Sequence, residues 1–289
     1  MENVTEPVVP KKPHTSASQI NTFTNCGEQY RRRYLEKEII PPGVAAVRGS
    51  SVHKGAEHNF VQKIKTFKDL PKAEIVDRAV AEFEARVKAD GVFMSDEEEA
   101  KGRAVVIGAE KDRTVRLTGV FASDVAPVYQ PEAVELKQTI VLPKAPRDIL
   151  GILDFVGTKV AEPTQKGIVD FKSVAKSKGQ KTWDADPALS IYDLTFRAKE
   201  GRAPDFIAVE ELVDTKVPKR VSITTSRSRR DFEALVARVN TVVSAVDAGV
   251  FVPANVGWWG CSPKWCGYWK TCAYVNAERK AAADSDDAG

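Results

Sequence analysis

The amino-acid sequence predicts an α/β protein, and three observations lead to this class. Apolar residues in the first half of the chain recur at helical spacing, whereas most segments of the second half alternate or run apolar, as strands do. These later segments follow in the order three strands, helix, two strands, helix. No apolar run among the 289 residues is long enough to span a bilayer. We therefore expect an α/β core behind an N-terminal helical region, with no membrane partner.

Four helices are expected before residue 130. Ser18 can cap the first helix, and Ser50 or Ser51 can open the second, because serine hydroxyls accept hydrogen bonds from free amide groups at helix starts. Helical spacing predicts a third helix over 72–89 and a long, glycine-interrupted fourth helix from 96 to about 125.

Five strands and two more helices are expected after residue 130. The strands are predicted at 133–142, 149–158, 167–174, 206–213 and 220–225. One helix begins near Asp186-Pro187, and the other runs from Ser228 to about Ala248.

A single domain is expected over residues 15–278. Residues 1–14 and 279–289 lack periodicity, so we expect a disordered N-terminal arm and a disordered tail. The domain divides into a mainly helical part, an α/β catalytic core and a cysteine-rich segment, at 15–130, 131–250 and 251–278.

The charge of the chain is small but unevenly distributed. The net charge is +3, with basic runs that include Lys176, Lys178 and Lys181. Such runs can follow a phosphate backbone, but solvated faces of helices and strands explain any one of them equally well. The N-terminus lacks the basic-then-apolar order of a secretory signal, so we expect a cytoplasmic, reducing location.

Two aspartates and a lysine form the most informative pattern. Asp154 and Asp170 each lie in a predicted strand among apolar residues, where an unpaired carboxylate is very costly to bury. If the strands form a hairpin, both carboxylates can converge on one Mg²⁺ or Mn²⁺ ion, and Lys172 shares the face of Asp170. Such an ion can activate water against a phosphodiester, while Lys172 orients the water or stabilises the transition state. Surface salt bridges are the common alternative for these three residues.

A histidine upstream can extend this site. His53 lies just inside the second predicted helix, with Glu57 one turn later on the same face. A lone helical histidine is usually structural, yet imidazole is also a good ligand for Mn²⁺.

Motifs in a fixed order along the chain resemble the RecB-like nucleases of the PD-(D/E)XK superfamily, which include the nuclease domain of AddB and the CRISPR-associated exonucleases of RecB type. The motifs are Ser18-x4-Phe23-x2-Cys26-x3-Tyr30-x3-Tyr34, Gly49-x3-His53, Gly151-x2-Asp154, Asp170-x-Lys172, a helix with Leu189 and Tyr192, and a C-terminal cysteine trio. The resemblance implies a restriction-endonuclease-like core, a central mixed sheet flanked by helices.

The same resemblance implies roles for individual residues. The implied metal ligands are His53, Asp154, Asp170 and the backbone carbonyl of Phe171. Lys172 would be the catalytic lysine, and Tyr192 would occupy the family's tyrosine position, with Glu57 as a supporting residue. The family usually has a glutamine one turn before that tyrosine, where this chain has Ala188. The residues expected to contact DNA are Arg48, Lys176, Lys178 and Lys181.

The four cysteines predict a metal centre. Cys261-x4-Cys266-x5-Cys272 lies far from Cys26 in the chain, unlike the paired spacing of zinc ribbons. Four thiolates can hold a 4Fe–4S cluster, with zinc or reduced structural cysteines as alternatives. The resemblance also implies a cluster, with one cysteine from the first helix and three from the C-terminus. Neighbouring aromatic residues can shield such a cluster or stack on unpaired bases. They are Trp258, Trp259, Trp265, Tyr268, Trp269 and Tyr274.

These patterns together predict a metal-dependent DNA exonuclease that acts on single-stranded or resected ends in recombination, repair or phage DNA metabolism. The alternatives are a CRISPR adaptation nuclease of the same fold and a non-catalytic DNA-binding or scaffold protein. No phosphate-binding loop of the G-x4-G-K-S/T type occurs, so a helicase, annealing or recombination partner would supply any motor activity.

Overall fold

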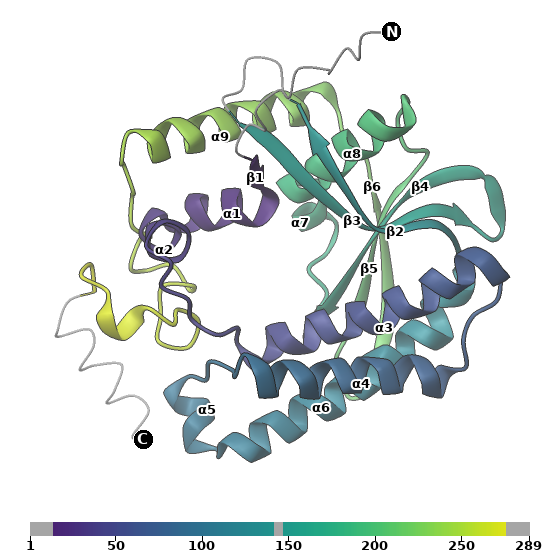
Figure 1. Ribbon diagram of the computed structural model, residues 1–289, viewed down its shortest axis with the longest axis horizontal. Helices are drawn as coiled ribbons and strands as arrows, with labels where there is room; N and C mark the ends of the chain where they lie inside the picture. The colour runs from purple at the N-terminus through teal and green to yellow at the C-terminus, as the bar shows by residue number, and fades with distance from the viewer. Residues whose placement is uncertain (1–13, 142–146, 276–289) are drawn as a thin grey trace, which may run out of the picture.

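The computed structural model describes residues 14–141 and 147–275 (Figure 1). The predicted tail, the predicted arm apart from His14, and the last residue of the predicted strand 133–142 lie outside the described residues.

Helices and short turns occupy most of the first 128 positions. They are α1 (Ala17–Asn25), α2 (Gly27–Tyr30), the π-helical turn η1 (Arg31–Leu35), α3 (Val44–Thr66), α4 (Lys72–Ala89), α5 (Asp96–Ala100), α6 (Arg103–Val120), η2 (Phe121–Val125) and η3 (Ala126–Val128). The strands and later helices are β1 (His14–Ser16), β2 (Tyr129–Ile140), β3 (Asp148–Lys159), β4 (Glu162–Val174), α7 (Gln180–Asp184), α8 (Pro187–Glu200), β5 (Ile207–Val213), β6 (Lys219–Thr225), α9 (Arg229–Asp247) and the turn η4 (Trp269–Thr271).

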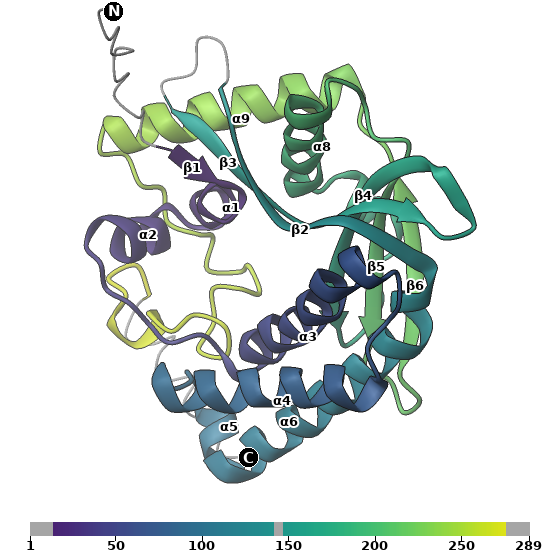
Figure 2. The same cartoon turned by 45° about the vertical axis from the view of Figure 1, so that its right-hand side comes forward.

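One mixed sheet joins all of these strands. Its order is β1-β3-β4-β5-β6, and β2 pairs with β3 outside this path. The β1–β3 and β4–β5 pairs are parallel, whereas β2–β3, β3–β4 and β5–β6 are antiparallel. The helices α3, α4 and α6 contribute to the apolar core on one face, and α7 and α8 cover the other (Figures 1 and 2). The predicted α/β class is therefore confirmed.

Three predicted helices differ from the structure, two in where they begin and one in its continuity. The first helix is capped by Ser16, which forms a capping box with Gln19, rather than by Ser18. The second begins at Val44 and not at Ser50 or Ser51, because both hydroxyls donate to carbonyls one turn earlier inside the helix. The fourth is two helices, since Gly102 adopts a φ of 90° between α5 and α6.

The apolar core between α3 and the sheet is strongly aromatic. Phe60 of α3 lies with its ring centroid 5.1 Å from that of Phe155 in β3 and 5.8 Å from that of Phe171 in β4. Aromatic contacts of this kind hold a helix firmly against a sheet. The core therefore fixes α3 across the strands that carry the aspartate motifs.

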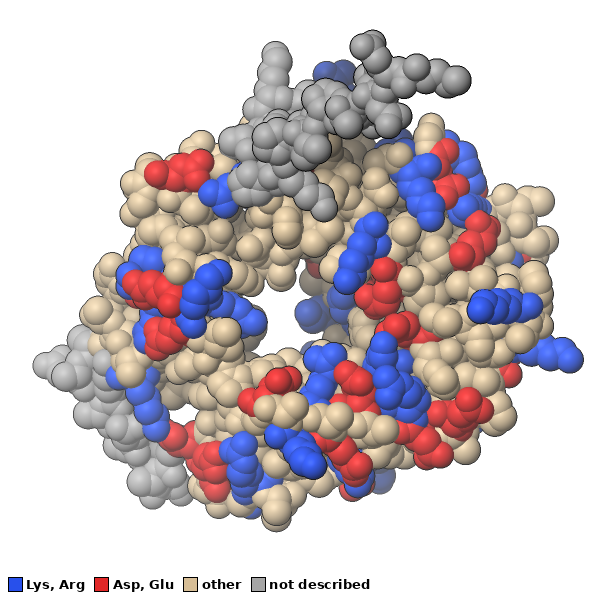
Figure 3. Space-filling model, viewed as in Figure 1, with Lys and Arg blue, Asp and Glu red and all other residues tan. Residues whose placement is uncertain are grey.

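An opening passes through the molecule. In the space-filling view it lies between α1 and α2 on one side and α3 and the sheet on the other, with Lys and Arg side chains on both sides (Figure 3). The chain closes the ring where the Gly27 amide donates to the Val252 carbonyl at 2.7 Å and where Lys270 pairs with Asp96 at 2.7 Å. Across the described residues, none of the helices is both long and apolar enough to cross a membrane.

Candidate functional site

The two aspartates lie where β3 and β4 separate. Their last paired residues on this side are Phe155 and Val169, and Asp154 and Asp170 come directly beyond that pair. The separation leaves the Phe171 amide without a strand partner on β3, and this amide instead donates to Asp154 Oδ2 at 3.1 Å. The predicted hairpin is therefore present, and its divergence makes room for the site.

His53 reaches Asp154 from α3. Its Nδ1 lies 3.3 Å from Asp154 Oδ2. Burial alone would lower the pKa of His53, but the Asp154 carboxylate outweighs burial and raises the pKa. The pKa of Asp154 is correspondingly lowered, because His53 and Lys172 offset the effect of its own burial. The helix and the hairpin thus meet at this pair.

Asp170 and Lys172 form a second pair on β4. Asp170 is 2% exposed, and Lys172 Nζ lies 2.7 Å from its carboxylate. Burial raises the pKa of Asp170 to about 6. Burial would lower the pKa of Lys172, but the carboxylates of Asp170 and Asp154 raise it above its usual value. The Lys172 ammonium lies 2.7 Å from both oxygens of the Asp170 carboxylate, so this ion pair compensates the buried charge.

Tyr192 and Ala188 lie on α8, which packs against β3 and β4 beside this pair. Burial raises the pKa of the Tyr192 phenol, and the charge of Asp170 raises it further. Ala188 occupies the first turn of α8, where its amide donates to the capping residue Asp186 at 2.8 Å. Tyr192 therefore stands near the Asp170–Lys172 pair, while Ala188, at the position of the family glutamine, carries no polar side chain.

Glu135 on β2 is a site residue that sequence reasoning missed. Single oxygen or nitrogen atoms of His53, Glu135 and Asp154 lie within 4.8 Å of one another, as metal ligands do. In the β2–β3 register Glu135 stands opposite Asp154, and its φ of 49° is rare for a residue with a side chain. Burial and the charge of Asp154 raise the pKa of Glu135. Its sequence context, a charged residue in an alternating strand, is typical of an exposed face and offered no signal.

A cleft of about 380 Å³ opens onto this group. It is lined by Gly49, Ser50, His53, Lys54, Glu57, Glu82, Arg86, Glu135 and Asp154. Glu57 lines this cleft, and its carboxylate binds Lys54 Nζ at 2.7 Å. Asp170 is not among the lining residues and is held instead by Lys172.

The residues expected to contact DNA separate into two kinds. Arg48 is buried, and its guanidinium binds Glu110 of α6, so it neutralises a charge inside the fold. The sequence-based expectation for Arg48 is therefore corrected: it is a structural residue. Lys176, Lys178 and Lys181 are exposed on the segment that follows β4.

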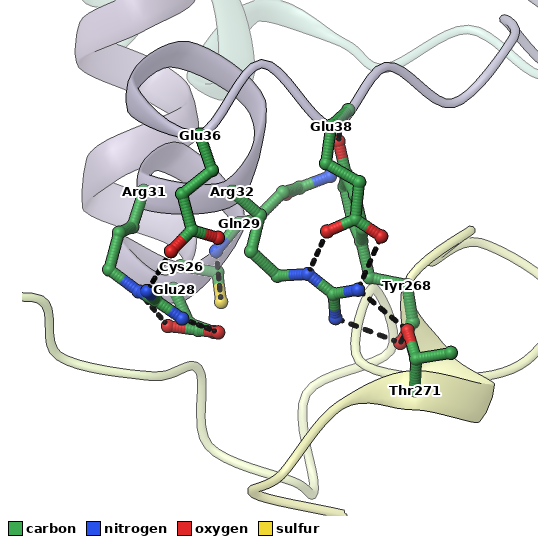
Figure 4. Close-up of polar contacts among 9 residues, drawn as sticks. All are labelled: Cys26, Glu28, Gln29, Arg31, Arg32, Glu36, Glu38, Tyr268 and Thr271. Atoms are coloured by element: carbon green, nitrogen blue, oxygen red, sulfur yellow. Dashed lines mark hydrogen bonds and ion pairs between the residues drawn. The ribbon is translucent and has the colours of Figure 1, made fainter.

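The four cysteines meet at the other side of the molecule. All of them line one pocket. Cys26 lies between α1 and α2 (Figure 4), and the other three lie in the C-terminal segment. Cys26 Sγ accepts the amide hydrogens of Gln29 and Ala254, each at 3.4 Å. Burial raises the pKa of the Cys266 thiol, and the nearby sulfurs of the other three cysteines raise it further.

A buried arginine ties this pocket together. Arg32 donates to Glu38 through two bonds of 2.6 Å and to Thr271 Oγ1 at 2.6 Å, and its guanidinium lies 4.6 Å from the Tyr268 ring centroid (Figure 4). Tyr268 and Trp269 are buried beside the cysteines, as predicted for shielding residues. Trp259, Trp265 and Tyr274 are more than half exposed, so the shielding role predicted for them is wrong.

Comparisons with known proteins identify the fold. The family profile described as the PD-(D/E)XK nuclease superfamily matches residues 14–273. A solved protein of Eubacterium rectale named "Putative exonuclease" shares 11% identity and a TM-score of 0.58, over 96% of this chain and 95% of that one. The solved structure of SSO0001 shares 14% identity over 70% of this chain and 95% of that one, and its TM-score of 0.36 carries no argument. No curated protein matches the chain.

Proposed function

The chain belongs to the PD-(D/E)XK nuclease superfamily, and we propose that it is a Mg²⁺- or Mn²⁺-dependent deoxyribonuclease, an exonuclease that acts on single-stranded or resected DNA ends. One observation carries the proposal. His53, Asp154 and the Asp170–Lys172 pair come from three separate elements and converge where β3 and β4 diverge.

The donor set fits a hard divalent cation. We propose His53, Asp154, Asp170 and the Phe171 carbonyl as its ligands and add Glu135, whose carboxylate already lies with His53 and Asp154. Carboxylate oxygens with one imidazole suit Mg²⁺ or Mn²⁺. The buried carboxylate of Asp170 supports the same assignment, because a cation would offset part of the cost of burying its charge. When bound, such an ion polarises the phosphate and lowers the pKa of a coordinated water.

The chain's own residues then perform the positioning. Asp170 holds the Lys172 ammonium at 2.7 Å, where it can orient the attacking water and neutralise charge that develops on the phosphate. The Phe171 amide fixes the orientation of the Asp154 carboxylate. Tyr192 covers the same pair from α8 and limits its contact with water. The role of the segment carrying Lys176, Lys178 and Lys181 is to bind the DNA backbone.

The opening through the molecule supports a single-stranded substrate with a free end (Figure 3). A closed ring admits a flexible single strand more readily than a duplex, and the strand must enter by its end. The name of the Eubacterium rectale protein agrees with an exonuclease. A partner protein that unwinds or anneals DNA would deliver such ends, since this chain has no nucleotide-binding loop.

The test compares end-labelled linear and circular single strands in the presence of Mn²⁺. We expect progressive degradation of the linear strand, no cutting of the circle, and loss of activity in Lys172→Ala and Asp170→Ala. Equal degradation by the wild type and both variants would show that the activity does not come from this site. Cutting of the circle would refute the exonuclease assignment and leave the nuclease assignment intact.

We further propose that the four cysteines bind a 4Fe–4S cluster. The single pocket that all four cysteines line and the two amide hydrogen bonds to Cys26 support this assignment. A cluster there would connect α2 to the C-terminal segment and so stabilise the ring. Cluster thiolates persist in a reducing cytoplasm, where we place the protein.

The metal content of anaerobically purified protein distinguishes the two metals. A brown colour, with iron and sulfide in comparable amounts, is the expected result. A colourless protein that carries stoichiometric zinc would contradict the cluster.

A further inference from the structure

Glu211 of β5 is a fully buried carboxylate beside the catalytic strand. It is 0% exposed and is the register partner of Lys172 across the parallel β4–β5 pair. Register partners in adjacent strands point to the same face of a sheet. Glu211 therefore lies next to Lys172, on the face that carries the catalytic pair.

Three donors from the segment after β4 converge on this carboxylate. Glu211 Oε1 accepts the Lys178 amide hydrogen at 3.0 Å and the Trp183 indole hydrogen at 2.9 Å. Glu211 Oε2 accepts the Ser177 hydroxyl. One side chain thus holds the loop between β4 and α7 and the first turns after it.

A comparison with its neighbour shows that this carboxylate is unusual. Glu210, equally buried on the opposite face of β5, is neutralised by two hydrogen bonds of 2.6 Å from Arg220. No Lys, Arg or His among the described residues forms an ion pair with Glu211. A buried charge without a counter-ion is unfavourable compared with a neutral side chain of similar size. Packing alone does not explain why a glutamate occupies this position.

Glu211 fixes the position of Lys178. It binds the backbone amide of Lys178 directly, and it also binds Trp183, whose ring centroid lies 5.3 Å from the Lys178 ammonium. Both ends of this exposed lysine are therefore fixed from the same buried carboxylate. A lysine held in advance loses less conformational entropy when it binds a ligand.

We propose that Glu211 is a positioning residue. It holds Lys178 where the lysine can bind one phosphate of the DNA strand, next to the phosphate that lies at Lys172. This inference rests on the proposed nuclease function and adds a phosphate-binding site to it.

Salt-dependent binding tests the proposal without catalysis. The probe is a fluorescein-labelled single-stranded oligonucleotide in EDTA, with its dissociation constant measured from about 0.1 M to about 1 M salt. Each lysine–phosphate contact to a single strand contributes about 0.7 to the slope of log affinity against log salt. Lys178→Ala should lower the slope by about 0.7, which weakens binding about fivefold at 0.1 M relative to 1 M salt.

Glu211→Met should reproduce most of this change, because methionine offers no acceptor oxygen to the Lys178 amide or the Trp183 indole. The double variant should match Lys178→Ala alone, because both changes remove the same contact. Glu210→Met is the matched control on the same strand, and it should leave the slope at the wild-type value. A merely structural role for Glu211 would reduce stability without changing the slope.

The possible results separate the two proposals. If the wild type binds and degrades single strands but Glu211→Met keeps the full slope, Glu211 does not position Lys178 and the nuclease function stands. If the wild type neither binds nor degrades DNA, the nuclease function itself fails. Should Glu211→Met not fold, Ser177→Ala removes one of the three donors and must also lower the slope; an unchanged slope there overturns the inference.

Discussion

Gly151 offers the sharpest test of how α8 is placed on the sheet. A Cβ atom added to Gly151 in β3 would lie 2.0 Å from Thr195 Oγ1 of α8, far inside any real contact distance. The Gly151→Ala variant must therefore push α8 away from β3. Overpacking of this kind in a filled core costs about 1 to 3 kcal/mol of unfolding free energy.

The size of the effect can be read from melting temperature. For a domain of this size a loss of about 1 to 3 kcal/mol lowers Tm by roughly 3 to 10 °C. Nuclease activity should fall as well, because α8 carries Tyr192 beside Lys172. The double variant Gly151→Ala/Thr195→Ala removes the closest atom, so it should recover part of the lost stability.

A second glycine provides the control for the same substitution. Gly108 is exposed within α6, and an added Cβ meets nothing within 4 Å there. Gly108→Ala should raise stability by up to about 1 kcal/mol, because alanine is the better helix former. If Gly151→Ala melts at or above the wild-type temperature, the close approach of α8 to β3 is not real, and the argument for Tyr192 at the site fails with it.

Three other predictions concern the charged and metal-binding residues. Glu135→Gln should raise the Mn²⁺ concentration for half-maximal activity about tenfold or more, whereas Glu57→Gln should change it little; equal effects would remove Glu135 from the site. Cys26→Ser should lose the brown colour and lower Tm, because the cluster would connect distant parts of the chain; full retention of iron would contradict this. The pKa of Asp170 is about 6 in the fold, above its ordinary 3.8, so the ionised form disfavours the metal-free fold. The stability of the metal-free wild type relative to Asp170→Asn should therefore fall as pH rises from about 4 to about 6, and parallel pH profiles would refute the assigned shift.

Local patterns in the sequence predicted more than the fold class. The helix over 72–89 has the bounds that the periodicity predicts, and the strands and later helices occur in the predicted order. The Asp170–Lys172 pair was also predictable, because a spacing of two residues in a strand places both side chains on one face. These features depend on residues within a few positions of one another, so a single segment contains the information that specifies them.

Other features depended on contacts between distant segments. Glu135 joins His53 and Asp154 only because β2 pairs with β3 and adopts a left-handed φ at that residue. Arg48 is buried because α6 brings Glu110 against α3. Nothing in the sequence around either residue indicates that the two form an ion pair. In the cysteine-rich segment Trp269 is buried whereas Trp259 is exposed. This difference likewise depends on which residues pack against each ring.

The sequence by itself therefore determined the element order, the family motifs and the chemical types of the residues proposed as catalytic. Tertiary structure alone decided which of the charged residues meet in the cleft, which are neutralised inside the fold, and that Glu211 lies beside Lys172 and holds the loop of Lys178. The physical reason is that hydrophobic periodicity and local hydrogen bonding act over a few residues. The partner and burial of a charge are set only when segments far apart in the chain pack together.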